Sequence, residues 1–200
     1  MFTETLYENQ KFLDVECEDG TLKLITFKNC DFRACVFTGA LVQGCVFEKC
    51  VFSGCKFNGA EFENCGFLNC KCKFCDMFTT SFVHGKMTGT VFSDCDFTTV
   101  SITEGNWSYT GLQHCDFSKK SLDNINFQCA DLRFANFDKA RVSGCDFTDC
   151  MLSNATFRNS DIRDNIFNNL DLQTTDIKGA KIDIGLAATI ASMLGAKCFY

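Results

Sequence analysis

Apolar residues recur along this chain with a period of five. Every fifth residue from Leu22 to Ile182 is apolar, and this register holds over 33 consecutive positions without an insertion or a deletion. Phenylalanine occupies 17 of these positions, which we call the centres. A second column, from Gly20 to Ala180, lies two positions before the centres; nearly all of its members are small, and 12 of them are cysteine. We call these the small positions.

The period of five fits neither an α-helix nor a long strand. A small residue and its centre are two positions apart, so both side chains point to one side of an extended segment and the residue between them points away. The two residues after each centre are rich in Asn, Asp, Gly, Ser and Thr, which favour turns. Each pentad therefore predicts one short wall and one corner, with the centre inside.

The pentads, among them NCDFR at 29–33, GCDFT at 144–148 and NATFR at 154–158, resemble the repeat of the pentapeptide-repeat family. The resemblance runs from Gly20 to Asp183. It implies an all-β fold, a right-handed quadrilateral β-helix of about eight coils in which four walls close each coil, followed by a short C-terminal α-helix. Coils stacked at the spacing of paired strands would form a rod roughly 40 Å long. We expect every centre to be buried and no α-helix before Asp183.

Three parts are expected along the chain: an N-terminal cap at 1–19, the solenoid at 20–183, and a capping and dimerisation segment at 184–200. Asp183 is a suitable N-cap for a helix that begins with IGLAATIASML, and Gly195 is a suitable stop. Apolar residues at helical spacing can cover the open end of the solenoid, and their surplus area predicts a tail-to-tail homodimer. The expected dimerisation residues are Leu186, Ile190, Met193, Leu194 and Phe199.

Composition narrows the class of function. The chain has no proline, as expected where almost every backbone N–H joins a ladder. A net charge of -6 argues against a surface that binds nucleic-acid phosphates. The N-terminal residues lack the basic and apolar regions of a secretory signal, and no apolar stretch reaches the length of a membrane span. We therefore expect a soluble, cytoplasmic protein.

The 16 cysteines need an explanation other than disulfide bonds in a reducing compartment. At the small positions, reduced cysteine acts as a small hydrophobe. Cys72 and Cys75 spell CxxC, but no second pair accompanies them, so we expect no zinc site and no other cofactor. His84 and His114 fall at corners, without a nucleophile and a carboxylate arranged around them. With the axis filled by centres, we expect no enzymatic activity.

The repeat becomes less regular between residues 77 and 120. Met77, Met87 and Trp107 replace phenylalanine at centres, and Lys120 occupies a small position, where an unpaired buried charge is expensive. Two interpretations stay open. The stretch is either a bend or bulge between two better-ordered halves, or tolerated drift within a long repeat.

Within the family, the chain most resembles the quinolone-resistance (Qnr-type) members. The ending DIGLAATIASMLGAKCFY and the central WSYTGLQHCDFSKKSLDN are similar to their terminal helix and middle coils. The resemblance implies a rod-shaped dimer that binds type II topoisomerase (DNA gyrase or topoisomerase IV) by resembling duplex DNA, conferring quinolone tolerance or modulating the enzyme. The uninterrupted pentads leave no place for the two projecting loops of many members.

Acidic residues supply a candidate surface for such a partner. Ten of the 25 acids occupy the outward position immediately before a centre. With four pentads per coil, one wall collects Asp76, Asp96, Asp116 and Asp176. Like charges at this spacing repel, which costs stability unless a cationic partner uses them. The alternative is that Asp is simply the usual residue of the repeat there, and that the protein is a structural scaffold with another protein partner.

Overall fold

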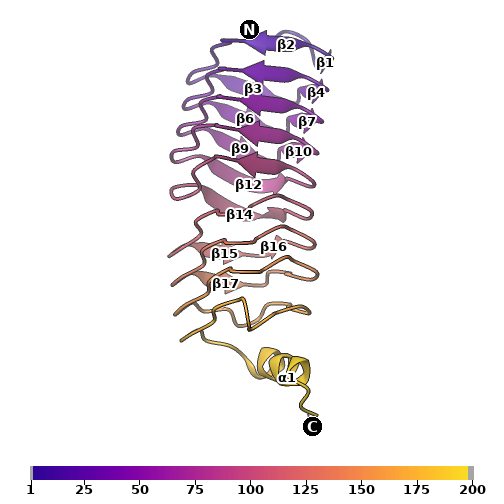
Figure 1. Ribbon diagram of the computed structural model, residues 1–200. Helices are drawn as coiled ribbons and strands as arrows, with labels where there is room; N and C mark the ends of the chain where they lie inside the picture. The colour runs from indigo at the N-terminus through magenta and orange to yellow at the C-terminus, as the bar shows by residue number, and fades with distance from the viewer. Residues whose placement is uncertain (1, 198–200) are drawn as a thin grey trace.

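The protein is a stack of short strands wound into one rod (Figure 1). The computed structural model describes residues 2–197. Every parallel residue pair joins equivalent positions of adjacent coils, from Leu6–Thr26 near one end to Asp161–Lys181 near the other. The expected right-handed quadrilateral β-helix with one short C-terminal helix is confirmed.

Two walls form one ten-stranded sheet, because β12 turns a corner and pairs on both sides of it. The first wall contains β3 (Thr21–Lys23), β6 (Leu41–Gln43) and β9 (Glu61–Glu63). The second contains β1 (Leu6–Glu8), β4 (Thr26–Lys28), β7 (Val46–Glu48) and β10 (Gly66–Leu68). The sheet is completed by β12 (Ser81–Lys86), β14 (Ser101–Asn106) and β16 (Ile125–Asn126).

The third wall is a five-stranded sheet of β2 (Lys11–Leu13), β5 (Asp31–Arg33), β8 (Val51–Ser53), β11 (Lys71–Lys73) and β13 (Val91–Ser93). Further along the first wall, β15 (Ser121–Asp123) and β17 (Arg141–Ser143) form a separate pair. The fourth wall is held by isolated bridges such as Val36–Lys56.

The solenoid begins inside the segment expected to be the N-terminal cap. Within residues 1–19, β1 and β2 pair with β4 and β5 of the next coil. Phe2 packs against this first coil, with edge-to-face contacts to Tyr7 and Phe27 at centroid distances of 5.4 and 5.0 Å. The capping role therefore falls to residues 2–5, Phe2 above all.

The centres form the core. Phe27 and Phe47, one coil apart, stack at 5.0 Å with an interplanar angle of 3°. Thirty of the 33 centres are buried, as expected. The last three are only half-buried, because the final coil has a neighbouring coil on one side alone: Leu172, Ile177 and Ile182.

All but one of the corners between residues 9 and 164 contain one residue with left-handed backbone, two positions after the centre. These residues run from Asn9 to Asp164 with positive φ, a conformation that favours Gly, Asn and Asp. Within that range, Thr99 is the single corner residue whose φ is not positive. The corner geometry therefore changes at one place near the middle of the rod.

The small positions carry hydrogen-bond donors as well as small volumes. The thiol of Cys70 donates to the carbonyl of Phe47 at 3.2 Å, and the hydroxyl of Thr90 donates to that of Phe67 at 2.7 Å. The same bond, to the equivalent carbonyl of the previous coil, is made by Cys50, Cys65, Cys150, Thr80 and Thr175. These side chains link each coil to the previous one.

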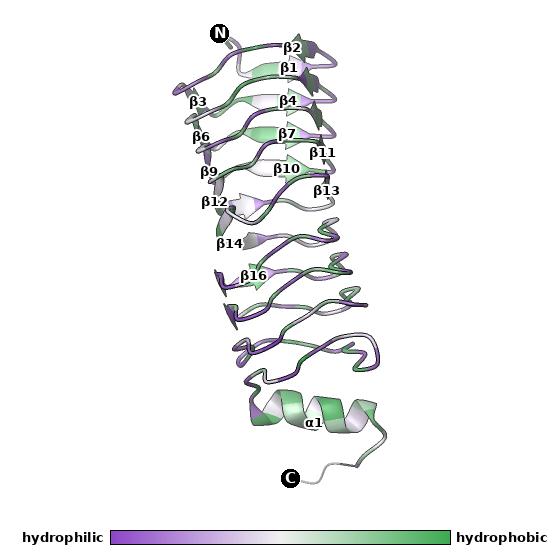
Figure 2. Ribbon diagram, turned by 60° about the vertical axis from the view of Figure 1, so that its left-hand side comes forward, coloured by the Kyte–Doolittle hydropathy of each residue, from purple (hydrophilic) through white to green (hydrophobic). Residues whose placement is uncertain are grey.

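The C-terminal helix α1 (Ile184–Met193) lies across the end of the rod (Figure 2). Its start is as expected, since the Asp183 carboxylate accepts a hydrogen bond from the Leu186 N–H at 2.8 Å. Its end is also as expected, with Leu194 as C-cap and Gly195 at φ +86°. This helix is too short to cross a bilayer, and the described residues contain no longer apolar one.

Candidate functional site

The fourth wall collects the acids expected to bind a partner. Parallel bridges give the register of three of them, Lys56–Asp76, Asp116–Asn136 and Thr156–Asp176, and Asp96 has the same position in the repeat but forms no bridge. Asp76 and Asp96 are exposed, whereas Asp116 and Asp176 are half-buried. The structure therefore places the four residues in one column that solvent can reach.

Each of these carboxylates also has a structural role. Asp96 Oδ1 accepts a hydrogen bond from the N–H of Thr98 at 2.8 Å, and the other three acids make the same contact two residues ahead. This Asx turn stabilises the bend after the centre. Asn106 makes it with its amide oxygen, which accepts from the N–H of Ser108 at 3.0 Å. Part of the acid content is thus explained by local backbone geometry.

Asp176 differs from the other three because it has an arginine partner. The Nε of Arg158 donates to Asp176 Oδ2 at 2.6 Å. The hydrogen bond from the Lys178 N–H, followed by that from Arg158, lowers the pKa of the Asp176 carboxyl. Its charge is therefore largely compensated within the molecule, which leaves Asp76, Asp96 and Asp116 as the better candidates for a cationic partner.

Lys120 occupies a small position, and the cost of partly burying its charge is offset because its ammonium reaches main-chain acceptors. Its Nζ donates to the carbonyls of Thr98 and Val100 at 2.9 and 2.7 Å. Burial lowers the pKa of this ammonium, while the nearby Asp116 and Asp96 act in the opposite direction. The acidic column thus has a cation near its middle.

Net charge is concentrated at the N-terminal end. The segment 1–19 contains six acids and one base, whereas the rest of the chain contains 19 acids and 18 bases. Five of the six net negative charges therefore belong to the first coil. Beyond it the rod is nearly neutral, so the acidic column is a local feature.

The backbone ladder is interrupted inside residues 77–120. Val91–Gly111 is the last bridge before the interruption and Gly105–Ile125 is the first after it. Between them, Ser101–Thr103 of β14 pair only with β12, and β15 pairs only with β17. We call this gap in pairing, between residues 93–104 and residues 113–124, the seam. It favours the first of the two interpretations of this stretch, a local irregularity between two ordered halves.

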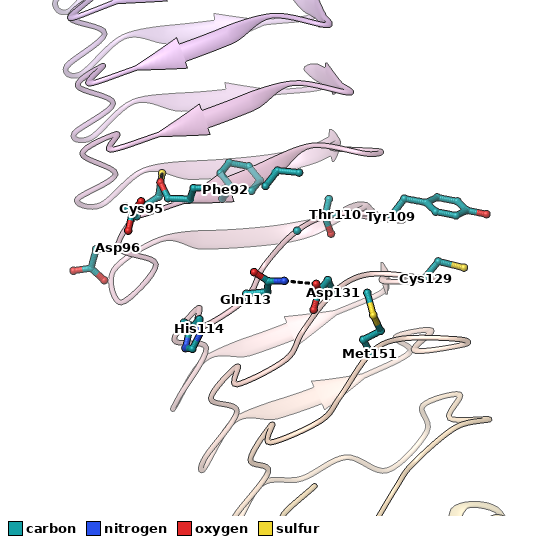
Figure 3. Close-up of a pocket in the computed structure, with 14 residues that line it drawn as sticks. Phe92, Cys95, Asp96, Tyr109, Thr110, Gln113, His114, Cys129, Asp131 and Met151 are labelled. Carbon is teal, nitrogen blue, oxygen red and sulfur yellow. Dashed lines mark hydrogen bonds between the residues drawn. The ribbon is translucent and has the colours of Figure 1, made fainter. Parts of the chain in front are cut away.

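Two grooves follow the seam. The larger, of about 760 Å³, lies between residues 91–96 and 109–114 (Figure 3). Exposed Val91, Tyr109 and Met151 surround it, and Gly111 has no side chain to fill it. Asp131, which accepts a hydrogen bond from the side-chain amide of Gln113, supplies polar lining. The second groove, of about 600 Å³, lies between residues 98–103 and 118–121.

Neither groove was predicted from the sequence. Two residues carried a signal: Gly111 stands at an outward wall position that holds Val91 and Met151 in other coils, and Lys120 stands at a small position. Neither residue breaks the period of five, so the register alone does not reveal the seam.

The residues expected to form a dimer divide into two pairs. Leu186 is buried and Ile190 is half-buried against the core, so these two cap the solenoid. Met193 and Leu194 remain exposed, at 39% and 72%. Phe199 lies outside the described residues.

Most of the cysteines lie in columns at the small positions, and both histidines are exposed. Cys72 and Cys75 are both buried, as expected of core residues. No three Cys, His, Asp or Glu side chains group as metal ligands within residues 2–197, and the 15 cysteines there are free thiols. Cys198 is beyond that range. His84 contacts Glu104 at 3.4 Å on the surface.

Known proteins share both the repeat and the shape. The family of Pentapeptide repeats matches in eight copies over residues 30–67, 112–144 and 140–179, together more than half of the chain. No curated protein sequence matches the chain. Trypsin-treated QnrB1, a plasmid-mediated fluoroquinolone resistance protein, has a TM-score of 0.75 at 21% identity, covering 98% of this chain and 97% of its own.

Full-length QnrB1 gives a TM-score of 0.71 at 20% identity, with 95% of this chain and 99% of QnrB1 covered. At this level of identity the likeness concerns the fold. The repeat, its register and its family match agree with one another, and the chain belongs to the pentapeptide-repeat family.

Proposed function

We propose that this protein binds a bacterial type II topoisomerase, DNA gyrase or topoisomerase IV, in place of duplex DNA, and so confers quinolone tolerance or modulates the enzyme. The observation that carries the proposal is the likeness to QnrB1, a plasmid-mediated fluoroquinolone resistance protein, over nearly the whole of both chains. The rod shape supports binding at a surface that otherwise holds a duplex.

Charge supports the proposal locally. B-DNA carries one negative charge per roughly 1.7 Å of helix axis. One column of carboxylates at the coil spacing of about 4.8 Å is much sparser. Shape therefore contributes most of the recognition, and Asp76, Asp96 and Asp116 add a charged contact near the middle of the rod. We expect binding to depend on salt less steeply than the binding of DNA does.

The proposed role is non-enzymatic and belongs to the cytoplasm, where the topoisomerase acts on DNA. The proposed active form is a homodimer joined through the C-terminal helices, supported by the exposed Met193 and Leu194. Two rods end to end would span roughly 80 Å, twice the length expected from the strand spacing.

A supercoiling assay tests the proposal. Purified gyrase is assayed with relaxed plasmid, with and without ciprofloxacin, over a range of concentrations of this protein. We expect either recovery of supercoiling in the presence of the drug or inhibition in its absence. An unchanged reaction in both arms, repeated with topoisomerase IV relaxation, would overturn the proposal.

A scaffold that binds a different protein is the second candidate. It is favoured by the near-neutral charge of the rod beyond residue 19, which is mild for a molecule that imitates DNA. Analytical ultracentrifugation of mixtures with gyrase and with topoisomerase IV separates the two candidates. A complex with neither enzyme would favour the scaffold.

A further inference from the structure

The seam leaves backbone hydrogen-bonding groups without main-chain partners. In regular coils the N–H of the residue before a centre donates to a carbonyl of the previous coil, as Asp76 does to Cys55 at 3.0 Å. The N–H of a centre donates to a carbonyl of the next coil, as Phe117 does to Asn136 at 2.7 Å. The two segments that face each other across the seam, residues 93–104 and 113–124, are its two lips. On them, some N–H groups find no acceptor among the described residues, including those of Asp94, Phe97 and Asp116.

The Lys120 side chain bridges the seam at one end only. In the preceding coil, the carbonyl of Thr80 accepts the N–H of Ser101 at 2.9 Å. The corresponding carbonyl, that of Val100, instead accepts the Lys120 ammonium at 2.7 Å. The other end, beside Asp94, has no such side-chain bridge between described residues, and the larger groove opens there.

Cys95 shows that this end is open to solvent. It lines the larger groove (Figure 3), and it is the single small-position cysteine in the described chain that is not fully buried. Cys75 and Cys115, one coil before and after it in the same column, are buried. The core is therefore less completely covered at the point where the main-chain groups lack partners.

We propose that an extended segment of the topoisomerase docks in the larger groove, adding its main chain to the free backbone groups there, the N–H of Asp94 among them. This proposal rests on the proposed function and specifies its contact. Unpaired strand edges are ready templates for another chain, and strand addition uses main-chain bonds for affinity and side-chain pockets for specificity.

The lining of the groove defines the side chains of that segment. Asp94 and Asp96 are exposed, and neither forms an ion pair with a described residue, so they suit a lysine or arginine. Val91, Tyr109 and Met151 are 41%, 64% and 47% exposed, and they suit an apolar side chain. Side chains alternate along a strand, so the segment should alternate basic and apolar residues.

Alkylation of Cys95 reports directly on occupancy. The full chain is treated with iodoacetamide under native conditions, alone and with saturating reconstituted gyrase, and each cysteine is followed by peptide mass spectrometry. We expect Cys95 to react much faster than Cys115 in the free protein, and gyrase to slow its reaction by about tenfold or more.

A substitution that fills the groove provides the second measurement. Gly111→Met places at this wall position the side chain that Met151 carries two coils later. The φ at Gly111 is ordinary, and the added Cβ would lie 3.0 Å from Val91 Cγ1, so the Val91 side chain must shift slightly. Gly66→Met is the control away from the seam: Gly66 is also at an outward wall position with ordinary φ, although it is buried and an added Cβ would meet Leu68 and Val46 at 3.8 Å. We expect Gly111→Met to weaken gyrase binding about tenfold or more, and Gly66→Met to leave it within about twofold.

The outcomes distinguish this inference from the proposed function. Gyrase binding with unchanged Cys95 alkylation, or with Gly111→Met as effective as the wild type, overturns the groove and leaves the proposed function standing. A Cys95 that is as inert as Cys115 in the free protein also overturns it. Absence of any gyrase binding by the wild type overturns both.

Discussion

At the scale of single residues, hydrogen bonding and volume together select the side chains of the small positions. The sequence pattern predicts a column of small residues, and burial confirms it. The donor role was missed, although Thr at 80, 90 and 175 was a signal for it. A thiol or hydroxyl there reaches a carbonyl of the previous coil, as Cys150 reaches Phe127 at 2.9 Å.

Removing one such donor should cost stability where a conservative replacement does not. Cys150→Ala leaves the carbonyl of Phe127 without this bond, and we expect the free energy of unfolding to fall by about 1 kcal/mol. Cys150→Ser keeps a donor and should lie closer to the wild type. Urea unfolding followed by circular dichroism measures both. Equal stability of the two variants would show that only volume matters.

Buried thiols should also make the fold sensitive to alkali. Burial raises the pKa of Cys65 and Cys150 to about 12 and that of Cys145 to about 11. Unfolded thiols ionise near pH ~8.5, so their contribution is complete below that pH and is lost as pH rises toward the folded values. At one pH unit above the pKa of the unfolded thiol, each such thiol should lower the free energy of unfolding by about 1.4 kcal/mol.

The measurement is urea unfolding at intervals from about pH 7 to pH 10.5. We expect a steady fall in the free energy of unfolding above about pH 8.5, with a shallower slope for Cys150→Ser, which removes one titrating group. A flat profile over the whole range would mean that the thiols ionise equally in both states.

At the scale of elements, the regular part of the fold followed from the sequence and the irregular part did not. The buried centres from Leu22 to Phe167, the Asp183 N-cap and the Gly195 stop are local signals, and each was confirmed. The seam depends on what neighbouring coils do to one another. Asp96 looks like Asp76 in the repeat, and only contacts with the adjacent coils separate their environments.

Lys120 should hold the two lips of the seam together. Lys120→Met keeps most of the volume but removes the donor to Val100 and Thr98, so we expect amide hydrogen exchange in residues 97–104 to rise about tenfold or more. Lys119→Met, one residue earlier on an exposed corner, removes the same charge and is the control. Equal exchange in the two variants would contradict a bridging role.

At the scale of the whole molecule, the two ends of the rod are unlike. The N-terminal coil holds most of the net charge, which opposes edge-to-edge stacking of two molecules at that end. The C-terminal end exposes apolar Ile184, Met193 and Leu194 around a buried Leu186. Association is therefore expected at the C-terminal end, with a two-fold axis between the helices.

Two substitutions in the helix distinguish its capping role from its proposed role in dimerisation. Met193→Asp changes an exposed residue and should give a folded monomer, whereas Ile190→Asp changes one that packs against the core and should also lower stability. Light scattering and thermal unfolding of both variants measure this. A wild-type protein that is monomeric at micromolar concentration would contradict the proposed dimer.

Displacement of duplex DNA from gyrase tests the proposed function most directly. A labelled duplex bound to gyrase is titrated with the wild type and with the Asp76→Asn, Asp96→Asn, Asp116→Asn triple variant, whose amides keep the Asx turns as Asn106 does. We predict that the wild type releases the duplex and that the variant, equally folded, needs about tenfold more protein at low salt. A duplex that stays bound at saturating wild-type protein would contradict binding in place of DNA.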